Sequence, residues 1–163
     1  MERKLIIRNF GAIASADIAL KDFNIFIGEQ GAGKSTVAKL ITIFENSRDK
    51  VLKVDSDYLM TKFSEYNIIS YFNPDSYISY SSEQGDITYE DGSFNFTFSY
   101  HSTSHNLYIP AERFFISTFS RSIATLVLSK APIPVTLLEF ASFYEKAKNL
   151  FVNYQVPIFN IIF

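Results

Sequence analysis

The chain has 163 residues, enough for one domain with a hydrophobic core, and its 47% of apolar residues exclude a disordered protein. The net charge of −2 gives no overall basic field, so the charge does not support nucleic acid as a partner. The absence of cysteine excludes a disulfide framework and a thiolate metal site, and no apolar run approaches the roughly 18 residues of a membrane span. We therefore expect a cytoplasmic protein that does not contact a membrane.

Three strands are predicted ahead of residue 28. Residues 4–10 and 12–20 are rich in Leu, Ile and Ala, and residues 22–27 end in an apolar run that indicates a buried strand leading directly into Gly28. Parallel strands need a connection of about a dozen residues, and the first two segments are much closer than that. The first pair is therefore expected to be an antiparallel hairpin.

A glycine-rich motif follows the third predicted strand. It fits the phosphate-binding loop pattern G-x-x-x-x-G-K-[ST], and a helical pattern of apolar residues continues from it to about residue 45. Glycines let the backbone turn its N–H groups toward phosphates, Lys34 brings an ammonium to the β- and γ-phosphates, and the Ser35 hydroxyl is a ligand for Mg²⁺ bound with the nucleotide. The following helix adds the positive end of its dipole. The predicted nucleotide-binding residues are Gly28, Glu29, Gln30, Gly31, Ala32, Gly33, Lys34, Ser35 and Thr36.

The pattern then changes from helical to alternating. Residues 57–72 place apolar side chains on one side of a predicted helix, which the Asn-Pro pair after it ends. Aromatic or β-branched residues next alternate with polar ones, and Asp91-Gly92 supplies a turn, so residues 76–110 are predicted to form an antiparallel meander. Its predicted strands are residues 77–80, 87–89, 94–98 and 107–109.

The C-terminal part is predicted to be helical over residues 112–152. Apolar spacing indicates a first helix over residues 112–130, which two prolines end. The capping-box pattern from Thr136 to Glu139 opens a second helix, to about residue 152. Residues 157–163 form an apolar run, so an exposed apolar patch is expected at this end of the chain.

Further candidates lie outside the loop. His101 and His105 are four residues apart, but Ser, Thr and Asn surround them and no third ligand is near in sequence, so we expect a solvated loop and no metal site. Arg113 is either the partner of Glu112 in an ion pair at a helix start or a contact to the nucleotide or to a partner subunit. Phe10 is expected in the core and not against an adenine.

Several segments resemble the ABC-type ATPase heads of the SMC, RecF and OLD-like group, which are AAA family ATPases. The segments are Ile-Arg-Asn-Phe at residues 7–10, Ala-Asp-Ile at residues 16–18, and residues 26–35; residues 108–113 are similar to the Pro-x-x-Arg segment of OLD-like ATPases. The resemblance implies an α/β P-loop NTPase fold, with an ABC-ATPase-head-like N-terminal lobe, an antiparallel meander and C-terminal helices. It also implies binding of ATP with Mg²⁺ and a head-to-head homodimer of the complete protein.

Two motifs of a complete ABC-type head are missing from the sequence. No two glycines are adjacent, so the Leu-Ser-Gly-Gly-type signature is absent, and the nearest match to an aliphatic strand ending in Asp-Glu, residues 51–55, is interrupted by Lys53. No catalytic residue is therefore assigned. We expect residues 1–163 to be a single incomplete ATP-binding domain, with the strands, loop and first helix in residues 1–45, from the N-terminal part of a larger protein. Hydrolysis would need the missing C-terminal lobe, and the chain alone is predicted to be inactive.

The sequence leaves two alternative functions. A non-catalytic nucleotide-gated interaction module would use the same loop without hydrolysis. A P-loop kinase or GTPase is less favoured, because antiparallel strands precede the loop. A guanine-specific Asn-Lys-x-Asp motif is also absent, and no Asp is followed three residues later by Gly.

Overall fold

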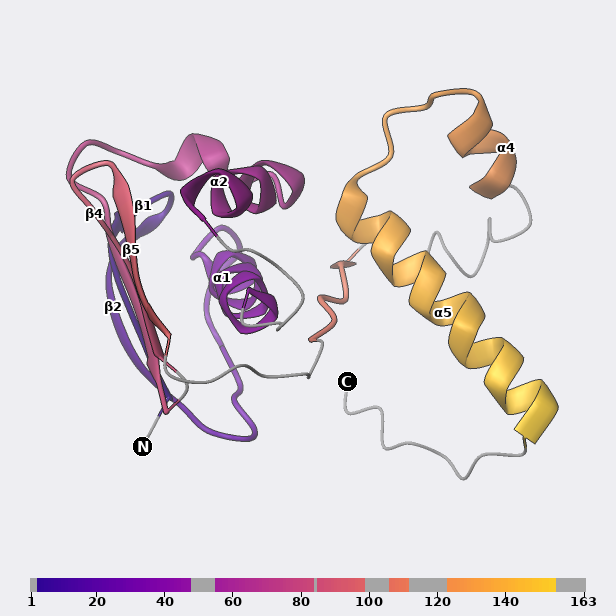
Figure 1. Ribbon diagram of the computed structural model, residues 1–163, viewed down its shortest axis with the longest axis horizontal. Helices are drawn as coiled ribbons and strands as arrows, with labels where there is room; N and C mark the ends of the chain where they lie inside the picture. Colours follow the sequence, from indigo (N-terminus) through magenta and orange to yellow (C-terminus); the bar gives the residue numbers. More distant parts are fainter. Residues whose placement is uncertain (1–2, 48–54, 84, 99–105, 112–122, 155–163) are drawn as a thin grey trace. The chain divides into compact units, whose positions relative to one another are not determined.

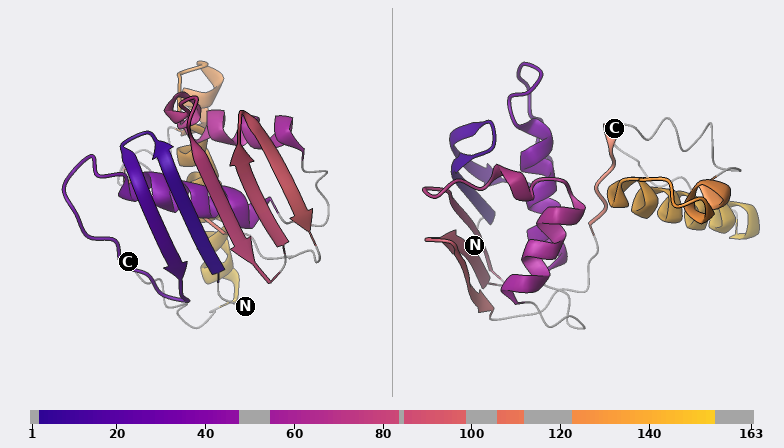
Figure 2. Two further views of the ribbon diagram at one scale, coloured as in Figure 1. Left: turned by 90° about the vertical axis from the view of Figure 1, so that its left-hand side faces the viewer. Right: turned by 90° about the horizontal axis from the view of Figure 1, so that it is seen from above.

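The computed structural model divides the chain into two units, Met1–Asn106 and Leu107–Phe163. The first unit holds an antiparallel sheet with helices on one face, and the described part of the second unit contains two helices (Figures 1 and 2). The residues that the structure describes are 3–47, 55–83, 85–98, 106–111 and 123–154.

The sheet of the first unit has five strands in the order β2-β1-β3-β4-β5, and every neighbouring pair is antiparallel. The predicted hairpin and the meander over β3 to β5 are confirmed. Asp91 and Gly92 both have positive φ, 50° and 78°, which is the backbone of a two-residue hairpin turn. The strands are β1 (Arg3–Phe10), β2 (Ile13–Leu20), β3 (Tyr77–Ser82), β4 (Gly85–Glu90) and β5 (Ser93–Phe98).

Helices α1 (Lys34–Asn46) and α2 (Ser56–Glu65) cover one face of this sheet, as both views of Figure 2 show. Alternate residues of the strands point toward the helices, and the helices meet them with residues three and four apart. Each fully buried side chain of this size stabilises the fold by roughly 1.5–3 kcal/mol. The fully buried residues include Leu5, Ile7, Leu40, Phe44, Leu59, Phe63, Ile78 and Tyr80.

Aromatic rings fill the space between the sheet and α2. The Phe10 ring is fully buried and lies edge-on to Phe72 and to Phe63, at centroid distances of 4.9 and 5.9 Å. Tyr89 and Phe94 extend the cluster across β4 and β5. The prediction that Phe10 belongs to the core is confirmed.

The second predicted helix ends earlier than its apolar pattern indicates. α2 stops at Glu65, Asn67 has the left-handed φ of 55°, and a short 3-10 helix, η1 (Ile69–Tyr71), follows. Lys39 of α1 donates a hydrogen bond from Nζ to the Tyr66 carbonyl, 2.8 Å away. The Tyr66 carbonyl, just past the end of α2, therefore has a hydrogen-bond donor from another helix. A tertiary contact thus accompanies the end of the helix, although the apolar spacing in the sequence continues.

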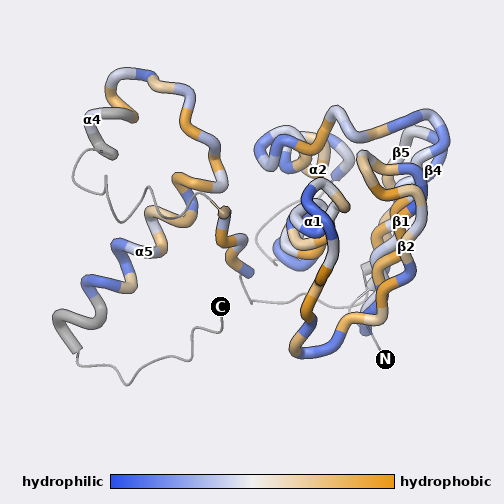
Figure 3. Tube along the Cα trace, turned by 180° about the vertical axis from the view of Figure 1, so that it is seen from behind, coloured by the Kyte–Doolittle hydropathy of each residue, from blue (hydrophilic) through white to orange (hydrophobic). Residues whose placement is uncertain are grey.

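The strand predicted over residues 22–27 is wrong. All six residues are described, and they form a connection without ladder pairing that separates from β2 and then leads to α1, visible as an orange stretch in Figure 3. Phe23, Ile25 and Ile27 expose 58%, 70% and 92% of their surface. A strand needs a neighbour for its N–H and C=O groups, and within the described residues the sheet ends at β2.

The second unit contains α4 (Ile123–Leu128) and α5 (Val135–Tyr154). The predicted strand at residues 107–109 is wrong, because three apolar residues are too few to form a strand without a neighbouring ladder. The last helix is confirmed, but it begins one residue before Thr136, so the predicted cap position is wrong. Pro134 accepts its first hydrogen bonds instead, from the N–H groups of Leu137 and Leu138. Residues 112–122 of the other predicted helix and the apolar run at 157–163 lie outside the described residues.

Among the described helices, none combines the length and the apolar character that crossing a membrane requires.

Candidate nucleotide-binding site

The predicted loop lies between β2 and α1 and ends in the first turn of α1. Gly31 and Gly33 have φ values of 84° and 87°, a backbone conformation that favours glycine, and Gly33 is the residue at which α1 is capped. The Gly33 carbonyl accepts the N–H of Val37 at 3.0 Å, which starts the helical ladder. The first N–H groups of a helix have no acceptor within it, so the N–H groups of this turn are donors for a ligand.

Lys34 closes the loop on itself. Its Nζ donates to the carbonyl oxygens of Gly28 and Glu29, at 2.7 and 2.6 Å. An ammonium has three N–H donors, so these two bonds leave a third for an anion. The positive charge therefore stands beside the N-terminus of α1, where the helix dipole has the same sign.

Ile13, the first residue of β2, lies next to the loop on the side of the sheet. A Cβ placed on Gly33 would lie 2.5 Å from Cγ1 and 3.0 Å from Cδ1 of Ile13. A Cβ placed on Gly31 would meet nothing within 4 Å, although the two glycines have nearly the same φ. Gly33 is thus required for space as well as for backbone conformation, whereas the side of the loop at Gly31 is open.

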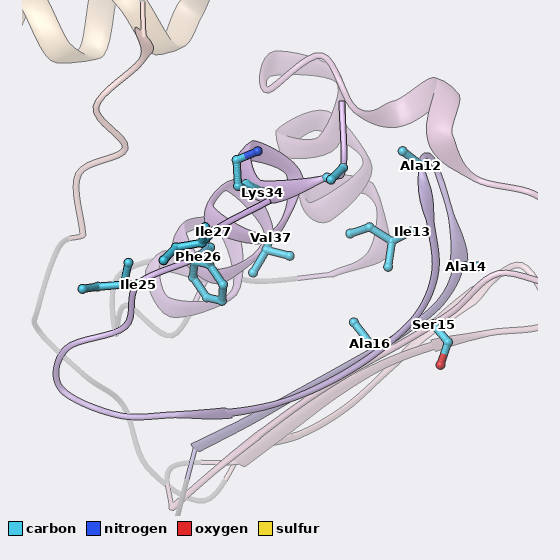
Figure 4. A pocket seen from close by; sticks show the side chains of 12 residues that line it. Ala12, Ile13, Ala14, Ser15, Ala16, Ile25, Phe26, Ile27, Lys34 and Val37 are labelled. Atoms are coloured by element: carbon cyan, nitrogen blue, oxygen red, sulfur yellow. The ribbon is translucent and has the colours of Figure 1, made fainter. Parts of the chain in front are cut away.

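A pocket of about 440 Å³ lies between the loop segment and the beginning of β2. Figure 4 shows Ile25, Phe26 and Ile27 along one wall and Ile13 and Ala16 of β2 along the other. Ala32, Gly33 and Lys34 also line this space, so the apolar walls and the predicted loop border the same pocket.

Arg3 fixes the start of the segment that leads into the loop. Its Nη2 donates to the Lys21 carbonyl at 3.2 Å and lies 3.4 Å from Asp22 Oδ1, and its Nη1 lies 3.5 Å from Glu45 Oε1. The same Glu45 oxygen accepts the hydroxyl of Tyr80, in the interior between α1 and β3. One guanidinium therefore connects residues 21 and 22, where the segment that leads into the loop begins, with the last turn of α1.

The other candidates from the sequence either have a structural role or lie outside the described residues. Asp55, the end of the nearest match to the Asp-Glu strand, caps α2: its Oδ1 accepts the N–H of Tyr58 at 2.9 Å. Arg113, His101 and His105 lie outside the described residues. Within the part that the structure describes, no group of three His, Cys, Asp or Glu side chains could hold a metal ion.

Comparison with known families decides the class of the chain. A family model described as AAA ATPase domain matches residues 1–154. The chain belongs to the AAA ATPase domain family. This confirms the prediction of an AAA family ATPase and supports ATP as the nucleotide and a P-loop NTPase as the class of protein. The comparison with curated proteins finds no significant match, and neither does the comparison with solved structures.

The loop of this AAA ATPase domain fits a magnesium-bound triphosphate chemically. The side of the loop at Gly31 is open, so a phosphate group could approach the backbone there without meeting a side chain. The Lys34 ammonium lies at the loop as well. Ser35 is exposed in the first turn of α1, so its hydroxyl is accessible to a ligand, whereas Thr36 is buried.

Two residues next to the loop segment, Ile13 and Arg3, could not be predicted from the sequence. Neither belongs to a motif, and each reaches the loop segment through space. The sequence of residues 12–20 marks Ile13 only as an apolar residue of a predicted strand.

Proposed function

We propose that residues 28–36 bind ATP with Mg²⁺ and that the chain is the ATP-binding N-terminal half of an ABC-type ATPase head of the SMC, RecF and OLD-like group. The observation that carries the proposal is the loop closed by Lys34 at the start of α1, in a member of the AAA ATPase domain family. In this proposal Lys34 contacts the β- and γ-phosphates, Ser35 binds Mg²⁺, and the loop N–H groups contact the remaining phosphate oxygens. A cytoplasmic location belongs to the same proposal.

Hydrolysis is proposed to require a C-terminal lobe in addition to these residues. Phosphoryl transfer to water needs a group that positions the water, and no residue of the chain is assigned that role. The exposed apolar segment at residues 23–27 supports an added lobe. A further strand could form hydrogen bonds with the backbone N–H and C=O groups of this segment and bury its side chains. Arg113 is proposed to lie near the nucleotide or at an interface between two heads.

The test is calorimetric titration of the chain with MgATP, for the parent, Lys34→Ala and Lys4→Ala. Lys4 is an exposed lysine of β1, so its variant removes the same charge away from the loop. Loss of a charge-assisted contact of about 1.5–3 kcal/mol corresponds to about tenfold to hundredfold weaker binding by Lys34→Ala, with Lys4→Ala unchanged.

Ser35→Ala should reduce the dependence of binding on Mg²⁺ more than the affinity for the nucleotide. The same samples should release no phosphate from ATP. Equal affinity of Lys34→Ala and the parent would contradict the binding proposal, and phosphate release that Lys34→Ala abolishes would contradict the need for another lobe.

A further inference from the structure

We propose that Ile13 is a positioning residue of the phosphate loop, which it holds in place through its contact with Gly33. The expected effect of Ile13 on ATP binding rests on the proposed function, whereas the contact between Ile13 and Gly33 is present in the chain without ligand. Ile13 would not touch the nucleotide. It would set where the N–H groups and the ammonium of the loop stand relative to the sheet.

The position of Ile13 is itself well fixed. Its side chain is only 7% exposed, and its backbone pairs with Phe10, which is fully buried in the aromatic cluster. The hairpin turn beside it is attached to η1, since the Gly11 N–H donates to the Tyr71 carbonyl at 3.0 Å. A Cβ on Gly11 would lie 2.7 Å from the Tyr71 ring, so the turn and η1 are in close contact. Ile13 therefore stands on a rigid part of the fold.

The loop depends on this support because the segment before it has little of its own. Residues 21–32 are all exposed. The two bonds from Lys34 go to carbonyls of the loop itself, so they close the loop without attaching it to the sheet. Arg3 holds only the start of the segment, and the 440 Å³ pocket separates residues 25–27 from β2. A ligand site is only as precise as the residues that support it.

The atoms of the contact suggest a discriminating pair of variants. Cγ1 of Ile13 makes the closest approach to Gly33, at 2.5 Å from the position of its absent Cβ, and Cδ1 is farther away at 3.0 Å. Valine keeps a γ-carbon at this place, and alanine does not. A role in positioning the loop thus predicts that Ile13→Val preserves the property that Ile13→Ala loses.

The experiment measures hydrogen exchange of peptides covering residues 28–36 in the ligand-free full chain, and MgATP affinity in parallel. Ile13→Ala should speed exchange in these peptides and weaken affinity about threefold to tenfold, whereas Ile13→Val should stay close to the parent. Ile7→Ala is the matched control: Ile7 is a fully buried isoleucine of β1, so its variant should lose stability without changing exchange of the loop.

If Ile13→Ala does not fold, Gly33→Ala and Gly31→Ala replace it. Only the new methyl group of Gly33→Ala would collide with Ile13, so only this variant should speed hydrogen exchange of the loop strongly. Equal loop exchange in Ile13→Ala and Ile7→Ala, in Ile13→Ala and Ile13→Val, or in the two glycine variants would overturn the proposal. A parent chain that does not bind MgATP would refute the proposed function, and loop exchange would still decide whether Ile13 positions the loop.

Discussion

Gly33→Ala is the substitution whose cost the structure defines most sharply. Gly33 has a φ of 87°, and its absent Cβ would lie 2.5 Å from Ile13 Cγ1. Gly31 and Gly92 have φ values of 84° and 78°, and a Cβ on either would meet nothing within 4 Å. The three glycines therefore share a backbone conformation, and only Gly33 adds a steric conflict.

The expected losses of stability follow from these two contributions. A residue other than glycine in left-handed backbone costs about 1–2 kcal/mol, which applies to all three alanine variants. Forcing an extra methyl against a packed side chain costs about a further 1–3 kcal/mol, which applies to Gly33→Ala alone. The free energy of unfolding should fall by about 2–5 kcal/mol in that variant, a large share of the roughly 5–15 kcal/mol of a typical domain.

Urea unfolding of the parent and the three variants would measure these differences, with the slope m checked for constancy so that the midpoints report stability. Gly31→Ala and Gly92→Ala should move the midpoint by similar small amounts, and Gly33→Ala by clearly more. If Gly33→Ala were no less stable than Gly31→Ala, the contact between the loop and β2 would not exist in solution.

Two further substitutions test the interior around α1 and α2. Tyr80→Phe removes the hydroxyl that donates to the buried Glu45 carboxylate, so unfolding should become easier by about 1–3 kcal/mol; an unchanged urea midpoint would show that water replaces the hydroxyl. Asp55→Ala removes the side-chain cap of α2 and should cost about 1 kcal/mol, while Asp55→Asn, which keeps an acceptor for the Tyr58 N–H, should cost clearly less; equal losses would argue against the cap.

Features encoded by neighbouring residues could be predicted from the sequence. The turn residues Asp91-Gly92 fix the hairpin between β4 and β5, because both need positive φ. The short spacing between the first two strands permits only an antiparallel pair, and the glycines and Lys34 define the loop with α1 behind it. Each of these predictions needed no knowledge of residues far away in the chain.

Features decided by distant contacts could not be predicted in this way. Residues 22–27 have the composition of a buried strand, but a strand also requires a partner, and the described sheet supplies none beyond β2. α2 ends at Glu65, and a lysine from α1 bonds to the carbonyl just past its end. Ile13 supports Gly33 across a gap in sequence that no local pattern reveals.

The place of β1 in the sheet has a consequence for the speed of folding. β1 pairs with β2 across a two-residue turn, but it also pairs with β3, which follows only after α1 and α2. The β1–β2 hairpin and the β3–β5 meander are local and can form within microseconds, whereas joining them closes a long stretch of chain at a substantial entropic cost. We expect this joining to be the slow step. Because the phosphate loop lies within the stretch that it closes, the loop should become ordered only after β1 and β3 have met.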